Sequence, residues 1–179
     1  MTPAGTGTVN ENLHILFALI FVFCVIYALI SDFTRLRIPN AVPIVLAVAF
    51  GAYALAGGTG NIWPHLALAG LTFILFFAFF ALGWVAAGDA KFLPAVMLWA
   101  GPAQGMRFIL LLAVIGGVFS LGLLGLRFTL NQYPVLAELP VLSKVCRWAR
   151  NGLCPYGIPI SVAALCVAPA IFAGRVLVP

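Results

Sequence analysis

Long apolar runs dominate the sequence, and short stretches between them contain most of the polar residues. A helix needs about 20 mainly apolar residues to cross the hydrocarbon core of a membrane. Five runs come close to this length, at residues 14–31, 41–57, 64–85, 106–126 and 156–174. A sixth run at residues 90–102 is shorter and contains Pro94. The pattern therefore predicts five membrane-spanning helices and a sixth, short candidate.

The positions of the basic residues favour counting the short run as a span. Cytoplasmic loops of membrane proteins carry an excess of Lys and Arg. With six spans, two basic residues lie on one side and seven on the other, the seven being Arg35, Arg37, Lys91, Arg127, Lys144, Arg147 and Arg150. Omitting the short span would move the charges that follow it to the opposite side. We therefore expect both termini outside the cytoplasm and cytoplasmic loops near residues 32–40, 86–91 and 127–155.

This pattern predicts an all-α integral membrane protein with about six transmembrane helices in one bundle, the fourth of them short. Residues 1–13 form a polar N-terminal tail, residues 14–175 a single six-span core, and residues 176–179 a C-terminal tail. The N-terminal tail has no Lys or Arg, and no small-residue cleavage site follows the first apolar run. We therefore interpret that run as a retained helix and not as a signal peptide.

The composition excludes a water-soluble globular domain. Hydrophobic residues make up 64% of the chain and charged residues 7%, whereas soluble domains carry about 25% charged residues. The net charge of +5 does not indicate nucleic-acid binding, because the basic residues are scattered through loops where topology explains them. The four cysteines form no C-x-x-C pair, so we expect no metal site. We expect the lipid bilayer as a partner, no nucleic acid and no cofactor.

Two aspartates stand out among the four acidic residues. Glu11 and Glu138 lie in the polar N-terminal region and in the long loop. Asp32 ends the first span in "ALISDFTRLRIPN", and Asp89 precedes the short fourth span in "AAGDAKFLPA". The expected topology places both carboxylates at the cytoplasmic edge of the membrane, although they are 57 positions apart.

Paired carboxylates at membrane depth indicate a specific chemistry. Ionisable groups held there are costly and are usually functional. Two carboxylates that meet share a proton, because like charges at short distance do not both ionise easily. The ionised member then accepts a proton from water while the protonated member polarises a carbonyl. This pattern is typical of aspartyl proteolysis of a peptide bond.

Other roles for the two aspartates remain open at this point. Each residue alone could be a helix cap or a topology anchor beside Arg or Lys, as in a non-catalytic assembly subunit. A small proton-coupled transporter or channel could use Asp32 and Asp89 as a relay. A relay is expected to place acids at several depths, ideally near the midplane, whereas these two lie at one edge. The pattern thus favours a peptidase.

The two stretches resemble the motifs of the type IV prepilin peptidases. "SDFTRLRIPN" is similar to the family's first motif, in which an Asp is followed, after a basic stretch, by Ile-Pro-Asn. "AAGDAKFLPA" is similar to the second motif, Gly-x-Gly-Asp followed by x-Lys. The peptidase core of that family also has six spans, with both motifs facing the cytoplasm. The size of the chain and its missing N-terminal extension resemble the short members that serve tight-adherence (Flp-type) pili.

The resemblance implies an activity and a location. Asp32 and Asp89 would be the catalytic pair of an intramembrane aspartyl endopeptidase in the bacterial inner membrane. Its substrates would be prepilins or pseudopilins, cleaved on the cytoplasmic side after a leader that ends in Gly, in support of pilus assembly or secretion. Longer members carry a cysteine-rich domain and methylate the new N-terminus, so we expect no methyltransferase activity here. Preflagellin is the alternative substrate within this class of peptidase.

The resemblance also implies supporting residues around each aspartate. Gly88 is kept from the Gly-x-Gly-Asp motif, whereas Ala86 replaces its first Gly. Lys91 matches the family's Lys and is expected either to neutralise Asp89 or to contact the substrate backbone.

Further supporting residues come from the start of the second and last spans. Pro39 is expected to start the second helix, and Asn40 to form a hydrogen bond near the site. Pro155 and Gly157 lie in "CPYGIPI", which resembles an element at the start of the family's last helix. That element is expected either to bind extended substrate backbone or to form a plain turn.

Overall fold

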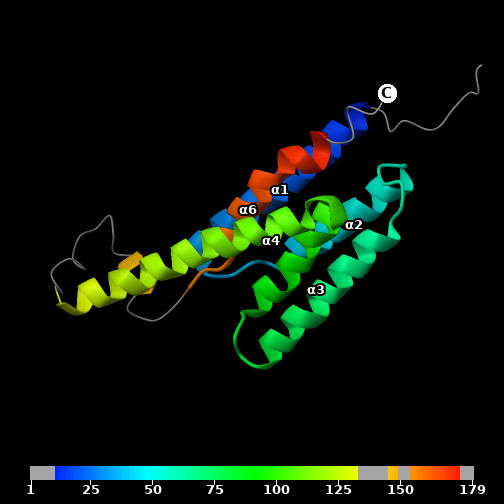
Figure 1. The fold of residues 1–179 in the computed structure, drawn as a ribbon. Coiled ribbons are helices and arrows are strands. Elements are labelled where there is room, and N and C mark those ends of the chain that lie inside the picture. The colour runs from blue at the N-terminus through cyan, green and yellow to red at the C-terminus, as the bar shows by residue number, and fades with distance from the viewer. Residues whose placement is uncertain (1–10, 133–144, 149–153, 174–179) are drawn as a thin grey trace, which may run out of the picture.

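The structure is a computed structural model that describes residues 11–132, 145–148 and 154–173 (Figure 1). The elements in this part of the chain are α-helices, and it contains no β-strand. The helices are α1 (Glu11–Arg35), α2 (Ala41–Leu55), α3 (Trp63–Ala81), α4 (Ala87–Gln132) and α6 (Gly157–Ala173), with a short helical segment at residues 145–148. The all-α prediction is therefore confirmed.

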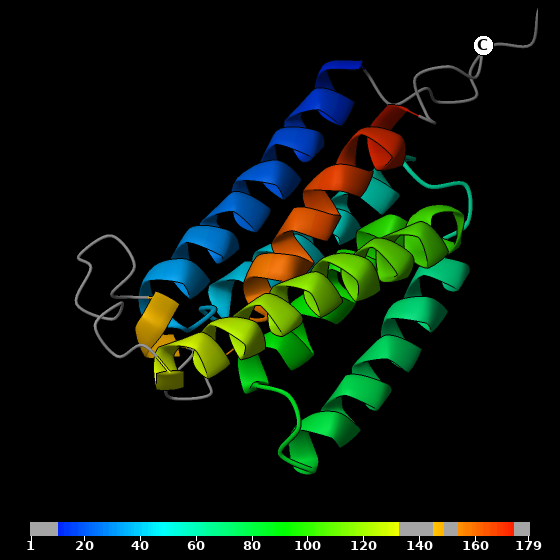
Figure 2. The ribbon, with the colours of Figure 1, turned by 60° about the vertical axis from the view of Figure 1, so that its left-hand side comes forward.

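Helix α4 consists of two parts that meet at a break. Gly101 has φ 56° and ψ −169°, which is not helical, and Pro102 follows it. A residue before proline avoids the helical region, and a positive φ is accessible to glycine without steric cost. The chain changes direction at this point (Figure 2). The break lies where the sequence predicted the boundary between the fourth and fifth spans.

The exposed surface of the helices is suited to lipid. Three helices, α1, α3 and α4, are long and apolar enough to cross a membrane, while α2 and α6 are apolar but shorter. Large apolar side chains point outward, such as Phe23 at 71% exposure and Leu121 at 68%. Apolar surface of this extent is unusual in a soluble monomer. These helices are those of a membrane protein; the number of crossings and the side on which each loop lies remain predictions.

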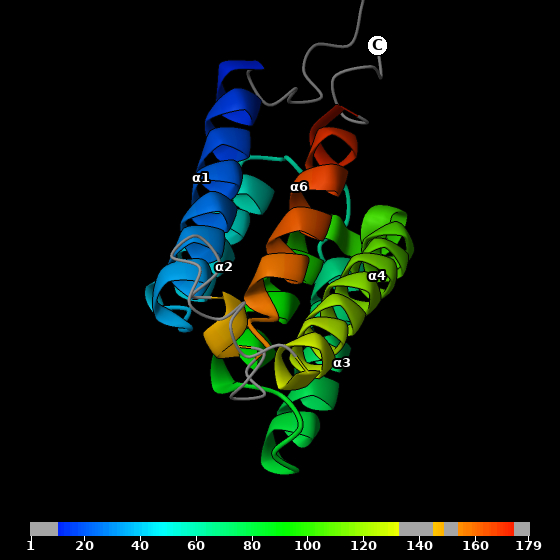
Figure 3. The same cartoon turned by 90° about the vertical axis from the view of Figure 1, so that its left-hand side faces the viewer.

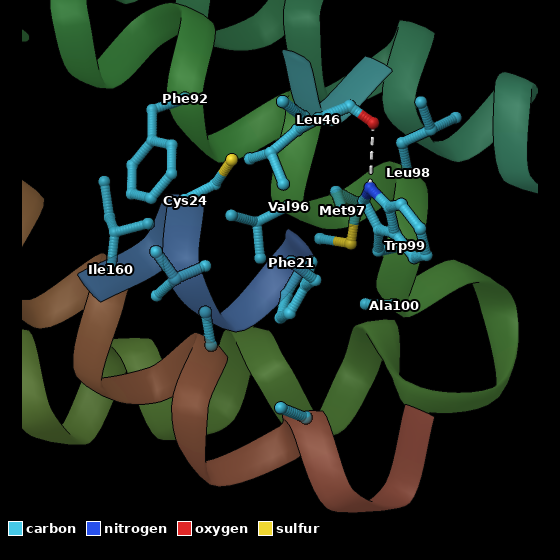
Figure 4. Packing of buried hydrophobic residues seen from close by; sticks show 14 of the residues in the cluster. Phe21, Cys24, Leu46, Phe92, Val96, Met97, Leu98, Trp99, Ala100 and Ile160 are labelled. Atoms are coloured by element: carbon cyan, nitrogen blue, oxygen red, sulfur yellow. Dashed lines mark hydrogen bonds between the residues drawn. The ribbon is translucent and has the colours of Figure 1, made fainter. Parts of the chain in front are cut away.

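Buried aromatic side chains hold the helices together around Trp99 in the first part of α4. The indole ring contacts Phe21 of α1, Phe50 of α2 and Phe172 of α6, with ring centroids 5.5 to 5.7 Å apart. Its Nε1–H donates a hydrogen bond of 2.9 Å to the carbonyl of Leu46 in α2 (Figure 4). Because lipid is as apolar as these side chains, close packing and hydrogen bonding stabilise such a bundle.

The packing order places α4 at the centre. Its backbone lies close to α2, α3 and α6, and the Trp99 ring also reaches Phe21 of α1. The backbone of α1 lies close to α2 and α6. The C-terminal end of α1 and the N-terminal end of α6 consequently lie at the same end of the molecule (Figure 3). The segment at residues 145–148 also lies at this end, where Trp148 packs edge-on against Phe33 with ring centroids 5.3 Å apart.

Candidate active site

A cavity of about 760 Å³ opens at the end of the molecule where α1 ends and α4 and α6 begin. Both Asp32 and Asp89 line this cavity, with exposures of only 5% and 6%. The other expected site residues that line it are Pro39, Asn40, Gly88, Lys91 and Pro155. Two sequence motifs 57 positions apart therefore meet in one cavity.

The chain turns sharply after Asp32 to form one wall of the cavity. Leu36 has a left-handed φ of 53° and its N–H donates to the carbonyl of Asp32 at 2.9 Å, an arrangement that ends α1. The Ser31 hydroxyl donates a hydrogen bond of 2.7 Å to the carbonyl of Arg37, which folds the loop back over the helix end. Pro39 lies two residues before the start of α2 at Ala41, and its carbonyl accepts a hydrogen bond from a first-turn amide of that helix.

The carboxylate of Asp32 lies against the first turn of α6. A Cβ atom at Gly157 would lie 2.7 Å from Oδ2 of Asp32, so only a residue without a side chain fits between them. The carboxylate thus lies at the N-terminal end of α6, which is the positive end of the helix dipole. Oδ2 is buried and has no hydrogen-bond partner within the described residues. This oxygen is therefore available to a bound group.

Asp89 lies in the first turn of α4, opposite Asp32. Gly88, directly before it, packs against the loop after α1, since a Cβ there would lie 3.3 Å from Cβ of Ile38. Both carboxylates line one cavity and are buried, so they form a pair of acidic groups in a confined space. Coupled carboxylates exchange protons as a unit and not as independent groups.

Three cations surround the carboxylate pair. Arg35, Arg37 and Lys91 line the same cavity. The Lys91 ammonium donates a hydrogen bond of 3.3 Å to Oδ1 of Asn40, which connects the first part of α4 to the start of α2. Asn40 therefore forms a hydrogen bond at the edge of the cavity.

The cavity also contains residues that were not among the expected site residues. Cys154 and Tyr156 line it from the segment that precedes α6. The Tyr156 hydroxyl lies so close to Gly116 of α4 that a Cβ there would overlap it, and the Cys154 sulfur lies 3.6 Å from the Ser120 hydroxyl. Position 156 lies within the "CPYGIPI" stretch, but nothing in that stretch indicates its contact with α4.

The thiol of Cys154 is not activated by its surroundings. Partial burial raises the pKa of Cys154; the hydrogen bond from Ser120 lowers it, and the negative charges of Asp89 and Asp32 raise it further. A thiol with a raised pKa is a poor nucleophile, because the thiolate is the reactive form. The described residues contain no group of three His, Cys, Asp or Glu side chains that could hold a metal ion. The two carboxylates are therefore the candidate reactive groups of the cavity.

The fold and the cavity together define a class of protein. It is a helical membrane protein with a buried pair of carboxylates at one end. The chain belongs to the type IV leader peptidase family: the sequence model of that family matches residues 19–121, more than half of the chain, and includes both aspartates. The resemblance seen in the motifs is thereby confirmed, and the protein is a member of a family of peptidases. A search of curated proteins gave no match, and a search of solved structures also gave none.

Proposed function

We propose that this protein is an intramembrane aspartyl endopeptidase of the bacterial inner membrane. It removes the leader from type IV, Flp-like prepilins or pseudopilins on the cytoplasmic side, in support of pilus assembly or secretion. The observation that carries the proposal is the meeting of Asp32 and Asp89, both buried, in a single cavity. Membership of the leader peptidase family supports the reaction class.

In the proposed mechanism the carboxylate pair holds one water molecule and one shared proton. The ionised aspartate accepts a proton as the water oxygen attacks the scissile carbonyl carbon, while the protonated aspartate hydrogen-bonds to the carbonyl oxygen. The tetrahedral intermediate then collapses, the C–N bond breaks, and the leaving amine takes up a proton from the pair. The net reaction consumes one water and requires no cofactor.

The substrate backbone must be extended for this attack, because the carbonyl groups of a helix are shielded by its own hydrogen bonds and side chains. We infer that the leader junction unwinds at the cavity, where the first turns of α4 and α6 and the loop after α1 meet. The free Oδ2 of Asp32 would contact the water or the scissile carbonyl.

Neutral isosteres of the two aspartates test the proposal. Asp32→Asn and Asp89→Asn should each reduce cleavage by at least about 10²–10⁴-fold, the usual contribution of a general acid or base. The measurement is the size shift of a candidate prepilin co-expressed with each variant, together with the amount of variant in the membrane fraction.

Glu11→Gln is the matched control. It removes one carboxylate charge from the other end of α1, outside the cavity, and should leave cleavage unchanged. Full cleavage by both single Asp→Asn variants would exclude an aspartyl mechanism. Flux of protons in liposomes without any peptide product would instead support the relay alternative.

A further inference from the structure

A second, apolar cavity adjoins the one that contains the aspartates. This groove has a volume of about 610 Å³ and lies between α2 and α3, with the first part of α4 as its floor. Representative lining residues are Ile44 and Ala47 of α2, Leu66 and Phe73 of α3, and Pro94 and Leu98 of α4. Asn40 and Lys91 are the polar residues of the lining, and both also line the first cavity. The groove and the carboxylate cavity therefore meet at the Lys91–Asn40 hydrogen bond.

The groove exists because the backbones of α2 and α3 do not approach each other closely, although the ring of Phe50 in α2 contacts the ring of His65 in α3, with centroids 5.3 Å apart. Both helices pack closely against α4. Figure 2 shows α3 at the edge of the bundle. The space between α2 and α3 is consequently bounded on three sides by helices and open on the fourth.

The lining of the groove suits a helix as the occupant. Small residues come from all three of its sides, namely Ala47 of α2, Ala69 and Gly70 of α3, and Ala95 of α4. In membranes, small side chains allow the backbones of two helices to approach closely. Gly70 contacts nothing on this side, since a Cβ there would have no atom within 4 Å.

Another apolar groove, between α1 and α2, has a similar size and provides a comparison. It has a volume of about 680 Å³, with Leu19, Phe23 and Val45 in its lining. None of its lining residues belongs to the carboxylate cavity. Size and apolarity therefore do not distinguish the two grooves, whereas continuity with the aspartates does.

We propose that the groove between α2 and α3 binds the apolar membrane helix of the substrate, and that Lys91 and Asn40 mark the point where the substrate leaves the helical conformation. The peptide then extends from this point to Asp32 and Asp89. This inference rests on the proposed peptidase function and adds to it the path by which the substrate is held. The groove would explain how a peptidase embedded in a membrane selects a bond next to an apolar helix.

Photo-crosslinking in liposomes tests the path directly. The probe is a designed peptide with a leader that ends in Gly, followed by an apolar helix of about 20 Leu and Ala residues that carries a benzophenone near its start. Incubated with the full-length Asp32→Asn variant, which retains the uncleaved peptide, the probe should crosslink to residues of α2 and α3 that line the groove. Crosslinks to the α1–α2 groove, or to lipid alone, would overturn the proposal.

Filling the groove gives an independent measurement with matched controls. Gly70→Leu and Ala47→Phe place added side chains in the groove and should lower kcat/KM for the probe about tenfold or more, through loss of apolar binding. Gly122→Leu makes the same change at an open, exposed glycine on the second part of α4. Val45→Phe enlarges a side chain of the α1–α2 groove. Both controls should cleave like the wild type.

The outcomes of these experiments distinguish the proposed groove from the proposed peptidase function. Cleavage by the wild type, together with unchanged cleavage by Gly70→Leu and Ala47→Phe, would refute the groove and leave the peptidase function standing. Equal cleavage by the wild type and by the Asp32→Asn and Asp89→Asn variants would refute the aspartyl mechanism, while the crosslinking pattern still reports where the helix binds. Thermal unfolding of each purified variant identifies any that lost activity by losing its fold.

Discussion

The position of Asp32 depends on two helix ends, the end of α1 and the start of α6, which are far apart in the sequence. It lies in the last turn of α1, while its carboxylate touches Gly157 at the start of α6. The positive end of the α6 dipole lies beside this carboxylate and favours a negative charge there. The absence of a side chain at position 157 is therefore part of the architecture of the site.

Alanine substitution of the two glycines beside the aspartates should have graded effects. In Gly157→Ala the new Cβ would lie 2.7 Å from Oδ2 of Asp32 and 2.7 Å from Cδ1 of Ile38, so the carboxylate must move. A displacement of about 1 Å at a reacting group costs about 10²-fold in rate, and we expect a loss of that order in leader cleavage.

Gly88→Ala should reduce cleavage less than Gly157→Ala in the same experiment. Its Cβ would lie 3.3 Å from Cβ of Ile38, which requires only a small adjustment, and cleavage should fall much less than in Gly157→Ala. Initial rates on the same substrate, with thermal unfolding of both variants, provide the comparison. A larger loss in Gly88→Ala than in Gly157→Ala would contradict the assigned geometry.

Ala86 departs from the motif of the family without a conformational conflict. Among the described residues Leu36 is the only non-glycine residue with a positive φ, so Ala86 does not occupy a backbone conformation that favours glycine. Its carbonyl accepts the first hydrogen bond of α4, from Ala90 N–H at 3.1 Å. Its side chain lines the cavity. An alanine is thus compatible with this position.

At the scale of the elements, the break in α4 determines where Asp89 and the groove lie. The first part of α4 carries Asp89 at its start and Trp99 in the core, and the second part carries Gly116, against which Tyr156 packs. His65 of α3 fills the space beside Gly101, and its Nδ1 donates a hydrogen bond of 2.8 Å to the carbonyl of Leu98. The break is therefore held from outside by a buried side chain of α3.

Gly101→Ala should destabilise the bundle. Its Cβ would overlap the His65 ring, and a backbone conformation with φ 56° and ψ −169° costs a non-glycine residue about 1–3 kcal/mol. We expect a lower midpoint of thermal unfolding in detergent. Gly122→Ala has open space around its Cβ and no positive φ, and should leave the midpoint unchanged or raise it slightly, because alanine favours the helix. Equal midpoints for Gly101→Ala and the wild type would show that the break does not depend on glycine.

At the scale of the whole molecule, the sidedness of the membrane decides whether the cavity meets its substrate. The six-span prediction places the cavity at the cytoplasmic edge and the C-terminus outside. An alkaline phosphatase fusion after Arg175 should therefore be active, because the enzyme requires the periplasm, and a fusion after Gln132 should be inactive. The same two fusions with β-galactosidase should show the opposite pattern. An active phosphatase after Gln132 would contradict the six-span topology.

The sequence by itself determined the features that depend on local order along the chain. Apolar runs indicated the membrane helices, Gly101 and Pro102 lie where the short span was expected to end, and two motifs of a few residues indicated the family. Acidic residues next to apolar runs also predicted Asp32 and Asp89 as candidate site residues, because charges are rare in such a chain.

Only the tertiary structure decided which helix faces meet. The helices are apolar on nearly every side, so hydropathy does not distinguish a face that packs on a neighbour from a face that contacts lipid. Trp99 is buried at 1% exposure, while Trp63 and Trp84 are exposed at 73% and 72%. The contact of Gly157 with Asp32, the fit of Tyr156 against Gly116, and the junction of the two cavities at Lys91 and Asn40 follow from packing between distant segments. Those contacts depend on shape in three dimensions, which a one-dimensional hydrophobic pattern does not contain.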